Sequence, residues 1–405
     1  MTTAPTDFPF GYCTNVHAGT TLDAAQANLV RYATPIRQQL APSGRLPVGL
    51  WLAEPAAREL LEADRIDRFG SWLDSHGFLP YTLNGFPQHD FHQPVVKHAV
   101  YEPTWMCQSR ADYTMMLVEI LALLLPERAT GSISTLPLGW PHAPWHAEDY
   151  HTAAEFLWEV AEYAQRIEQE SGRHIVIAIE PEPGCVLNTA DEVVEFFEHF
   201  LFRGPAEQAA RHHLSVCHDI CHSGVMFESQ MAALERYHAA GIRIGKVQVS
   251  SAVHVPWDRY RDDLASSQQC LEQLQTFNEP KFLHQTTEST PSGNLARICE
   301  DLPQALDRWV SAGQYPSHPW RIHFHVPVFV DRFELLETTQ ADIAQVASWL
   351  HSHSSSTVGD RPWFTGHYEV ETYAWTVLPP SLAQTDLADG ITQELQYFAN
   401  VLRDC

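Results

Sequence analysis

The chain alternates between short apolar segments and longer amphipathic ones, and this alternation restricts the folds open to it. The apolar segments are hydrophobic at consecutive positions, as in "HIVIAI" at 174–179, so both faces of the corresponding strands are expected to be buried. Strands of this kind occur in parallel sheets that are covered by helices. Amphipathic helical segments lie between them, as in "TAAEFLWEVAEYAQRIEQES" at 152–171. The pattern predicts an α/β fold.

Eight such strand–helix units predict one (β/α)8 TIM barrel over 1–405. An open doubly wound sheet is the alternative, but no GxGxxG follows the first strand. Two further apolar segments, "KFLHQTTE" and "RIHFHVPVF", exceed the eight, so 252–330 is expected to be an insertion in the later part of the barrel. Which of its strands joins the barrel wall stays open. The eight strands are expected near 10–16, 47–52, 78–86, 132–140, 174–182, 214–222, 244–251 and 366–373.

Polar and charged residues concentrate at the carboxyl-terminal ends of these strands. In "IAIEPEPG", a buried strand ends in Glu180 and Glu182, and side-chain alternation puts both carboxylates on the same side. In a parallel barrel all such ends lie at one rim, so we expect these groups to converge there. The other candidates at strand ends are Asn15, His17, Asn84, Trp140, Asp219, His222, Gln248, His323, His325, Glu369 and Glu371.

Several carboxylates at one rim are costly without counterions, because they repel one another and lose solvation. A divalent cation removes this cost, and carboxylates with imidazole nitrogen or amide oxygen form a suitable ligand set. Pairing with Arg or Lys is the alternative for Glu180 and Glu182, but basic residues are scarce in the rim segments. Buried imidazoles with satisfied hydrogen bonds are the alternative for His323 and His325. We predict one divalent metal ion, Mn or Zn, with Mg as a further option.

With these residues identified, the chain resembles the xylose isomerase-like TIM barrel superfamily, which includes sugar phosphate isomerases and epimerases and AP endonuclease family 2. The resemblance lies in "IAIEPEPG", "HDICH", "GKVQVSS" and "EVETY". It implies that His222 contacts the substrate or a second metal. The metal ligands that it implies are Glu180, Asp219, Gln248 and Glu371. Glu369 stays the alternative to Glu371, and His325 the alternative to Gln248.

More closely, the chain resembles the EboE-type proteins, xylose isomerase-like barrels named after a bacterial metabolite-traffic operon. The segments "GYCTNVHAG", "LPLGWP", "CHDICHSGV", "HFHVPVF" and "EVETYAW" carry this resemblance. Two features depart from the compact ketose 3-epimerases. Gln248 stands where those enzymes usually have a histidine, and the insertion at 252–330 is absent from them. A simple ketose 3-epimerase assignment therefore does not follow from the resemblance.

These features predict a metal-dependent isomerase- or epimerase-like enzyme acting on a sugar-like or polyhydroxylated carbonyl metabolite. The metal would stabilise an enediolate, while Glu180 and Glu371 remove and return the proton. A non-catalytic, metal-containing metabolite-binding or traffic protein is the alternative, and an endonuclease IV-like phosphodiesterase is less favoured. The residues expected to contact the substrate or to support the ligands are Glu182, His222, His323, His325, Glu369, Asn15, His17, Asn84 and Trp140.

The charge balance bears on the partners that the chain can have. It carries 50 acidic and 25 basic residues, a formal net charge of -25, which disfavours nucleic acid and anionic membrane surfaces. No apolar stretch reaches membrane-spanning length, and no signal peptide is recognised. Eight cysteines in 405 residues do not indicate a disulfide framework, so a cytoplasmic location is expected. The expected partner is a small metabolite, and a homo-oligomer stays an open option.

Overall fold

A closed barrel of eight parallel strands forms the centre of the computed structural model, which describes residues 7–312, 315–380, 382–383 and 386–405. The predicted (β/α)8 barrel is therefore confirmed, and each barrel strand overlaps one of the eight predicted segments. Going round the barrel, the strands are β1 (Gly11–Cys13), β2 (Leu46–Trp51), β3 (Phe78–Asn84), β4 (Thr130–Thr135), β5 (His174–Ile179), β6 (Leu214–Asp219), β7 (Ile244–Val249) and β16 (Tyr368–Val370).

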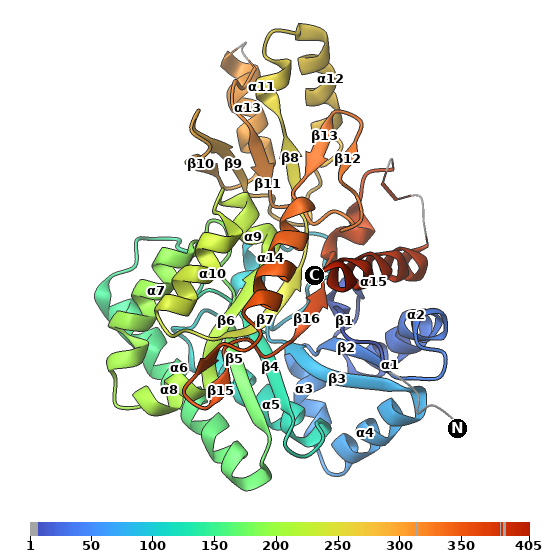
Figure 1. Cartoon of the computed structure of the whole chain (residues 1–405), viewed down its shortest axis with the longest axis vertical. Helices are drawn as coiled ribbons and strands as arrows, with labels where there is room; N and C mark the ends of the chain where they lie inside the picture. Colours follow the sequence, from blue (N-terminus) through green and yellow to red (C-terminus); the bar gives the residue numbers. More distant parts are fainter. Residues whose placement is uncertain (1–6, 313–314, 381, 384–385) are drawn as a thin grey trace.

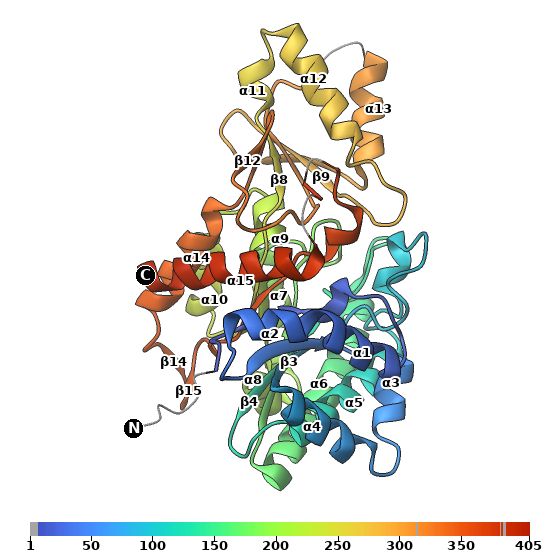
Figure 2. The same ribbon diagram turned by 90° about the vertical axis from the view of Figure 1, so that its right-hand side faces the viewer.

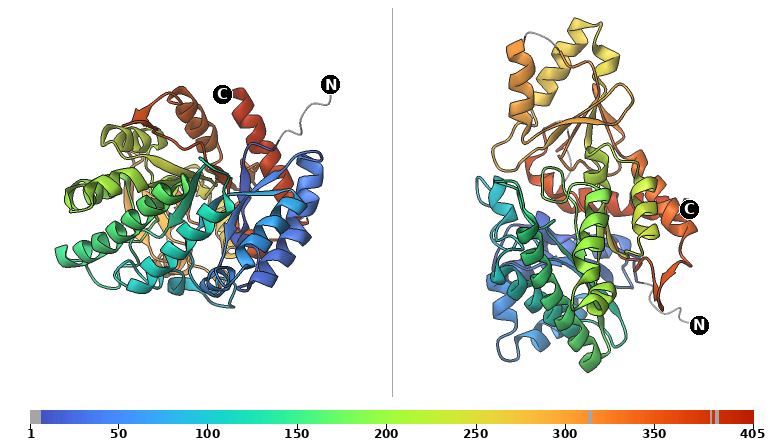
Figure 3. Two further views of the ribbon diagram at one scale, coloured as in Figure 1. Left: turned by 90° about the horizontal axis from the view of Figure 1, so that it is seen from below. Right: turned by 90° about the vertical axis from the view of Figure 1, so that its left-hand side faces the viewer.

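Helices surround the barrel, as the view from below shows (Figure 3). Local signals set several of their ends: a capping box at Thr189 and Glu192 begins α7, and Gly172, with φ of 69°, ends α6. No helix in the described part of the chain has the length and apolar character to cross a membrane. The main helices of this layer are α1 (Leu22–Asn28), α2 (Thr34–Leu40), α3 (Glu54–Leu60), α4 (Arg65–His76), α5 (Gln108–Leu124), α6 (Ala147–Ser171), α7 (Ala190–His199), α8 (Glu207–His213), α9 (Ile220–Val225), α10 (Gln230–Ala239), α14 (Ala341–Ser352) and α15 (Leu387–Asp404).

Between β7 and α14 the chain leaves the barrel and forms a second, antiparallel sheet above the carboxyl-terminal rim (Figures 1 and 2). Among the described residues, none of its strands joins the barrel wall, whose last position is taken by β16. The sheet reaches Thr338, beyond the expected boundary at 330. In sheet order its strands are β10 (Leu295–Cys299), β9 (Thr286–Ser289), β11 (Trp320–Ile322), β8 (Val253–Val255), β13 (Leu336–Thr338) and β12 (Arg332–Phe333). Its helices are α11 (Trp257–Tyr260), α12 (Leu264–Gln275) and α13 (Leu302–Ala312).

Layers of side chains inside the barrel decide which residues reach the rim. Strands β16 and β7 align Glu369 with Gln248, and side chains two residues apart point to the same side. Glu369 lies in a lower layer, where it forms an ion pair of 2.5 Å with the buried Lys246. Gly49 leaves room for the Glu369 carboxylate, since a Cβ at position 49 would fall 1.1 Å from Glu369 Oε1. Glu371 lies one layer higher, at the rim.

Candidate active site

A pocket opens at the carboxyl-terminal rim of the barrel. Its floor is polar and comes from the ends of the barrel strands and from the segment that follows β11 of the second sheet. Its wall is largely apolar, and part of it comes from the segment that leads into β9 of the second sheet. The floor consists of Asn15, Asn84, Ser134, Glu180, Glu182, His222, His323, His325 and Glu371. The wall and mouth consist of Phe86, Pro87, Phe91, Lys97, Val100, Tyr101, Phe282, Leu283 and Tyr373.

Three carboxylates converge at the floor of this pocket, which Glu180 and Glu371 line and beside which Asp219 lies. Glu180, Asp219 and Glu371 each offer an oxygen, and these oxygens all lie within 4.8 Å of one another. Asp219 is held in place as the N-cap of α9, where its Oδ1 accepts the backbone N–H of His222 at 2.9 Å and the hydroxyl of Ser250 at 2.7 Å. Glu371 accepts the Asn15 amide at 2.6 Å. The three groups are buried, so their mutual repulsion is weakly screened.

The electrostatics of these carboxylates indicate a missing positive charge. Burial, reinforced by Glu371 and Asp219, raises the pKa of Glu180 well above its usual value. Burial and the same kind of repulsion raise the pKa of Glu371 to about 8, while the Lys246 ammonium opposes the rise. Asp219 Oδ2 and Gln248 Oε1 are buried and have no hydrogen-bond partner among the described residues. Three carboxylates and an unused amide oxygen are a donor set that fits a divalent metal ion.

Three histidines beside the carboxylates have one ring nitrogen free. The Nδ1 atoms of His222, His323 and His325 lie 2.8, 2.8 and 2.9 Å from carbonyl oxygens of Pro181, Gln285 and Glu371. A carbonyl oxygen only accepts, so each Nδ1 carries the hydrogen and each neutral ring keeps a lone pair on Nε2.

Two of these Nε2 atoms lie next to Asp219. The Nε2 atoms of His222 and His325 lie 3.8 and 4.0 Å from Asp219 Oδ2. The Nε2 atoms of His222 and His323 lie only 3.1 Å apart. Burial lowers the pKa of His222 to about 3 and that of His325 to about 4, which keeps these rings neutral. They can therefore bind a cation or accept a hydrogen bond from a substrate hydroxyl.

Glu182 lies apart from the three converging carboxylates. Its Oε1 accepts the hydroxyl of Tyr101 at 2.6 Å, while its Oε2 is buried without a hydrogen-bond partner among the described residues. Burial raises its pKa to about 8, against the lowering effect of the Tyr101 hydrogen bond. Near neutral pH it is mainly protonated, so it can donate a proton in the pocket.

Comparison with family models finds no match for the chain, and comparison with curated proteins finds none either. Its fold is similar to that of a xylose isomerase-like TIM barrel protein from Mycobacterium smegmatis in complex with magnesium. The TM-score is 0.51 at 10% identity, over 100% of this chain and 99% of that one. The chain therefore shares the TIM barrel fold of that protein. A xylose isomerase domain protein from Planctomyces limnophilus is similar too, with a TM-score of 0.50 at 12% identity over 98% of this chain and 99% of that one.

Within this barrel, the sequence candidates lie at different depths. Asn15 and Asn84 line the pocket, and Gln248 lies beneath it with its amide 3.2 Å from Asn84 Oδ1. Trp140 lies behind the wall, where it stacks on Tyr101 with ring centroids 5.2 Å apart. His17, expected near the substrate, lies at a separate small cavity, because its ring bonds the Tyr12 hydroxyl at 2.9 Å and stacks on Tyr32.

Several residues of the site were not among the sequence candidates. Lys246 supplies a buried positive charge beneath the carboxylates, and Tyr101 orients Glu182. Phe282 belongs to the chain that leads into the second sheet, and Tyr373 follows the last barrel strand. A lysine within an apolar strand, "GKVQV", was the one local signal, since a buried ammonium needs an anionic partner.

Proposed function

We propose that the chain is a metal-dependent isomerase- or epimerase-like enzyme that acts on a polyhydroxylated carbonyl metabolite. The observation that carries the proposal is the convergence of Glu180, Asp219 and Glu371 within 4.8 Å. Glu180 and Glu371 also line the pocket with the apolar wall. Membership of the EboE-type proteins is part of the proposal and rests on the sequence motifs alone. The similar barrel from Mycobacterium smegmatis is in complex with magnesium, which supports a divalent metal as part of the proposal.

Glu180, Asp219 and Glu371 would hold the metal, with Gln248 Oε1 beneath them as a further oxygen donor. Bound there, the ion would supply Lewis acidity toward the oxygens of a substrate carbonyl and its neighbouring hydroxyl. Oxygen donors suit Mg or Mn, and the free Nε2 atoms of the nearby histidines extend the choice to Zn. Lys246 beneath the floor offsets part of the negative charge.

The acid–base work falls to glutamates on two different sides of the floor. Glu180 follows β5 and Glu371 follows β16, and β6 and β7 lie between these strands in the barrel. One carboxylate would accept the proton from the carbon next to the carbonyl, and the other would return it. The apolar wall would exclude water from the exchanging proton.

Metal analysis tests the ligand assignment. Protein purified without an affinity tag should contain a divalent metal, and Glu180→Gln should lose it while keeping the circular dichroism spectrum of the wild type. Glu207→Gln, on the exposed face of α8, is the matched control and should keep the metal. Full metal content in Glu180→Gln would refute the assignment.

Hydrogen exchange tests the reaction. A panel of ketoses, aldoses and inososes would be incubated with the metal-loaded enzyme in D2O, and deuterium next to the carbonyl would be measured by mass spectrometry. We expect exchange into one class of compound, loss of exchange in Glu371→Gln, and normal exchange in Glu207→Gln. Saturable binding of a compound without deuterium uptake would favour the carrier. Cleavage of a phosphodiester instead would favour the endonuclease-like alternative.

A further inference from the structure

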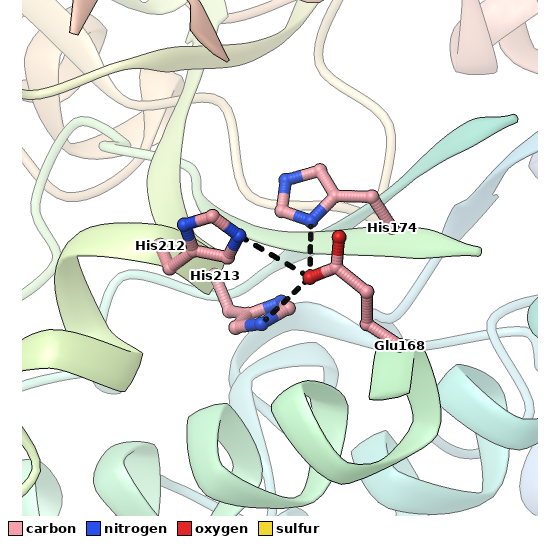
Figure 4. A group of neighbouring side chains, drawn as sticks. All are labelled: Glu168, His174, His212 and His213. Carbon is pink, nitrogen blue, oxygen red and sulfur yellow. Dashed lines mark hydrogen bonds and ion pairs between the residues drawn. The ribbon is translucent and has the colours of Figure 1, made fainter. Parts of the chain in front are cut away.

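A second group of ligand-type side chains lies at the opposite end of the barrel from the pocket. Glu168 lies near the end of α6, His174 is the first residue of β5, and His212 and His213 end α8, just before β6. Amino-terminal ends of parallel strands share one rim, so the four residues meet at the rim that the pocket does not use. Figure 4 shows the three rings arranged around the single carboxylate.

The distances in this cluster are compatible with a metal site. Glu168 Oε2 lies 3.1 Å from His174 Nδ1, 3.2 Å from His212 Nε2 and 3.4 Å from His213 Nε2 (Figure 4). The three ring centroids are 4.9, 4.9 and 5.0 Å apart, so the rings are nearly equidistant. In a tetrahedral site with zinc bonds of 2.0–2.1 Å, neighbouring ligand atoms lie about 3.3 Å apart. The three distances from Glu168 Oε2 to the ring nitrogens are close to this value.

The hydrogen bonds of His213 show that a positive charge is needed between the groups. Its Nδ1 lies 2.8 Å from the backbone oxygen of Ile175, so Nδ1 carries the hydrogen and Nε2 of the neutral ring keeps a lone pair. That lone pair faces Glu168 Oε2, which is also an acceptor. His213 is fully buried, and its Nε2 has no hydrogen-bond partner among the described residues. A ring whose Nδ1–H donates to a backbone carbonyl is the usual arrangement of a metal-binding histidine.

We propose that Glu168, His174, His212 and His213 bind a zinc-type transition metal ion that holds α6, α8 and the start of β5 together. Three imidazoles and one carboxylate favour zinc over magnesium or calcium, which prefer oxygen ligands. The role is structural, because the four protein ligands fill a tetrahedral shell and this rim lies away from the pocket. This site is independent of the function proposed for the pocket.

Two neighbouring arginines affect the affinity of this site for a metal ion. Arg361 bonds Glu168 Oε1 and lies 3.3 Å from His212 Nε2, and Arg243 lies 3.3 Å from His174 Nε2. Arg361 leaves Glu168 Oε2 available, but its charge opposes a second cation. A metal on His174 Nδ1 would shift the ring hydrogen to Nε2. Arg243 would then keep its other acceptor, the His212 backbone oxygen at 3.0 Å.

Zinc binding by the full-length protein tests the proposal. Metal-free wild type, His212→Asn and His213→Gln would be loaded with zinc, dialysed, and analysed for zinc per chain and for the zinc-dependent rise in melting temperature. We expect each variant to bind one zinc ion fewer than the wild type, whatever the pocket holds. His199→Asn, an exposed histidine at the end of α7, should bind as the wild type does.

Two further measurements keep the test decisive. His212 is partly exposed, so His212→Asn should fold even if His213→Gln does not. Arg361→Gln should tighten zinc binding by about tenfold, because a unit charge close to the ion is removed. The proposal is overturned if His212→Asn keeps the wild-type zinc content, or if the only zinc that the protein binds is lost in Glu180→Gln. A zinc affinity unchanged by Arg361→Gln would contradict the predicted position of the ion.

Discussion

Replacing Glu371 by glutamine should stabilise the metal-free protein, although it removes a proposed metal ligand. In the metal-free fold the pKa of Glu371 is raised from 4.5 to about 8. At pH 7 the folded state must therefore hold a proton that the unfolded state releases, which costs about 3 kcal/mol at 1.36 kcal/mol for each pH unit between 4.5 and 7. Glutamine avoids this cost and can still accept the Asn15 amide that Glu371 Oε1 accepts at 2.6 Å.

The effect should be visible in thermal unfolding. With an unfolding entropy of about 2.1 cal/mol/K per residue, 405 residues give about 0.85 kcal/mol per kelvin. Metal-free Glu371→Gln should therefore melt about 4 °C above the metal-free wild type at pH 7. The difference should vanish near pH 4, where the carboxyl is protonated in both states. Adding magnesium, which three imidazoles and one carboxylate at the other rim do not favour, should raise the melting temperature of the wild type and leave that of the variant nearly unchanged.

A metal-free variant that melts at or below the metal-free wild type at pH 7 would refute this reasoning. A difference between the two proteins that does not change from pH 4 to pH 8 would refute it equally. Glu207→Gln makes the same chemical change on the surface, and it should change the melting temperature neither at pH 4 nor at pH 8.

Three other predictions rest on the same buried charges. The stability of the metal-free wild type should fall as pH rises from about 4.5 to about 8, because burial raises the pKa values of Glu371 and Glu182. Bound metal should make this fall smaller. Thermal melts at several pH values measure both effects. Lys246→Met should destabilise the protein by about 3–5 kcal/mol by leaving Glu369 unpaired, and adding Glu369→Gln should recover most of the loss in urea unfolding. Tyr101→Phe should raise the pKa of Glu182 further, because the hydrogen bond of 2.6 Å that stabilises its carboxylate is lost; an NMR titration of labelled glutamate carboxyls measures this shift.

The sequence determined the barrel and the rim at which the pocket lies. Continuously apolar strands separated by amphipathic helices are a local and periodic signal, and a parallel barrel places every strand end of one kind at one rim. The convergence of Glu180 with Asp219 follows from that rule alone, because each residue ends its own strand.

Only the tertiary structure decided which of two neighbouring candidates reaches the rim. Glu369 and Glu371 are indistinguishable in "EVETY", but the register of β16 on β7 puts the first beside Lys246 and the second beside Asn15. The second sheet likewise brings Phe282 to the pocket wall. Such contacts depend on strand register and on the path of an insertion, and neither is encoded in the spacing of residues along one segment.

The cluster at the other rim shows the same limit. Its histidines stand among 23 in the chain, and nothing in the spacing of "RHI" and "RHHL" links them to Glu168. Residues 168–174 and 212–213 meet because α6 and α8 pack against each other as they enter β5 and β6. Strand and helix periodicity is a property of neighbouring residues and can be read from the chain, whereas the meeting of distant side chains is a property of the closed barrel.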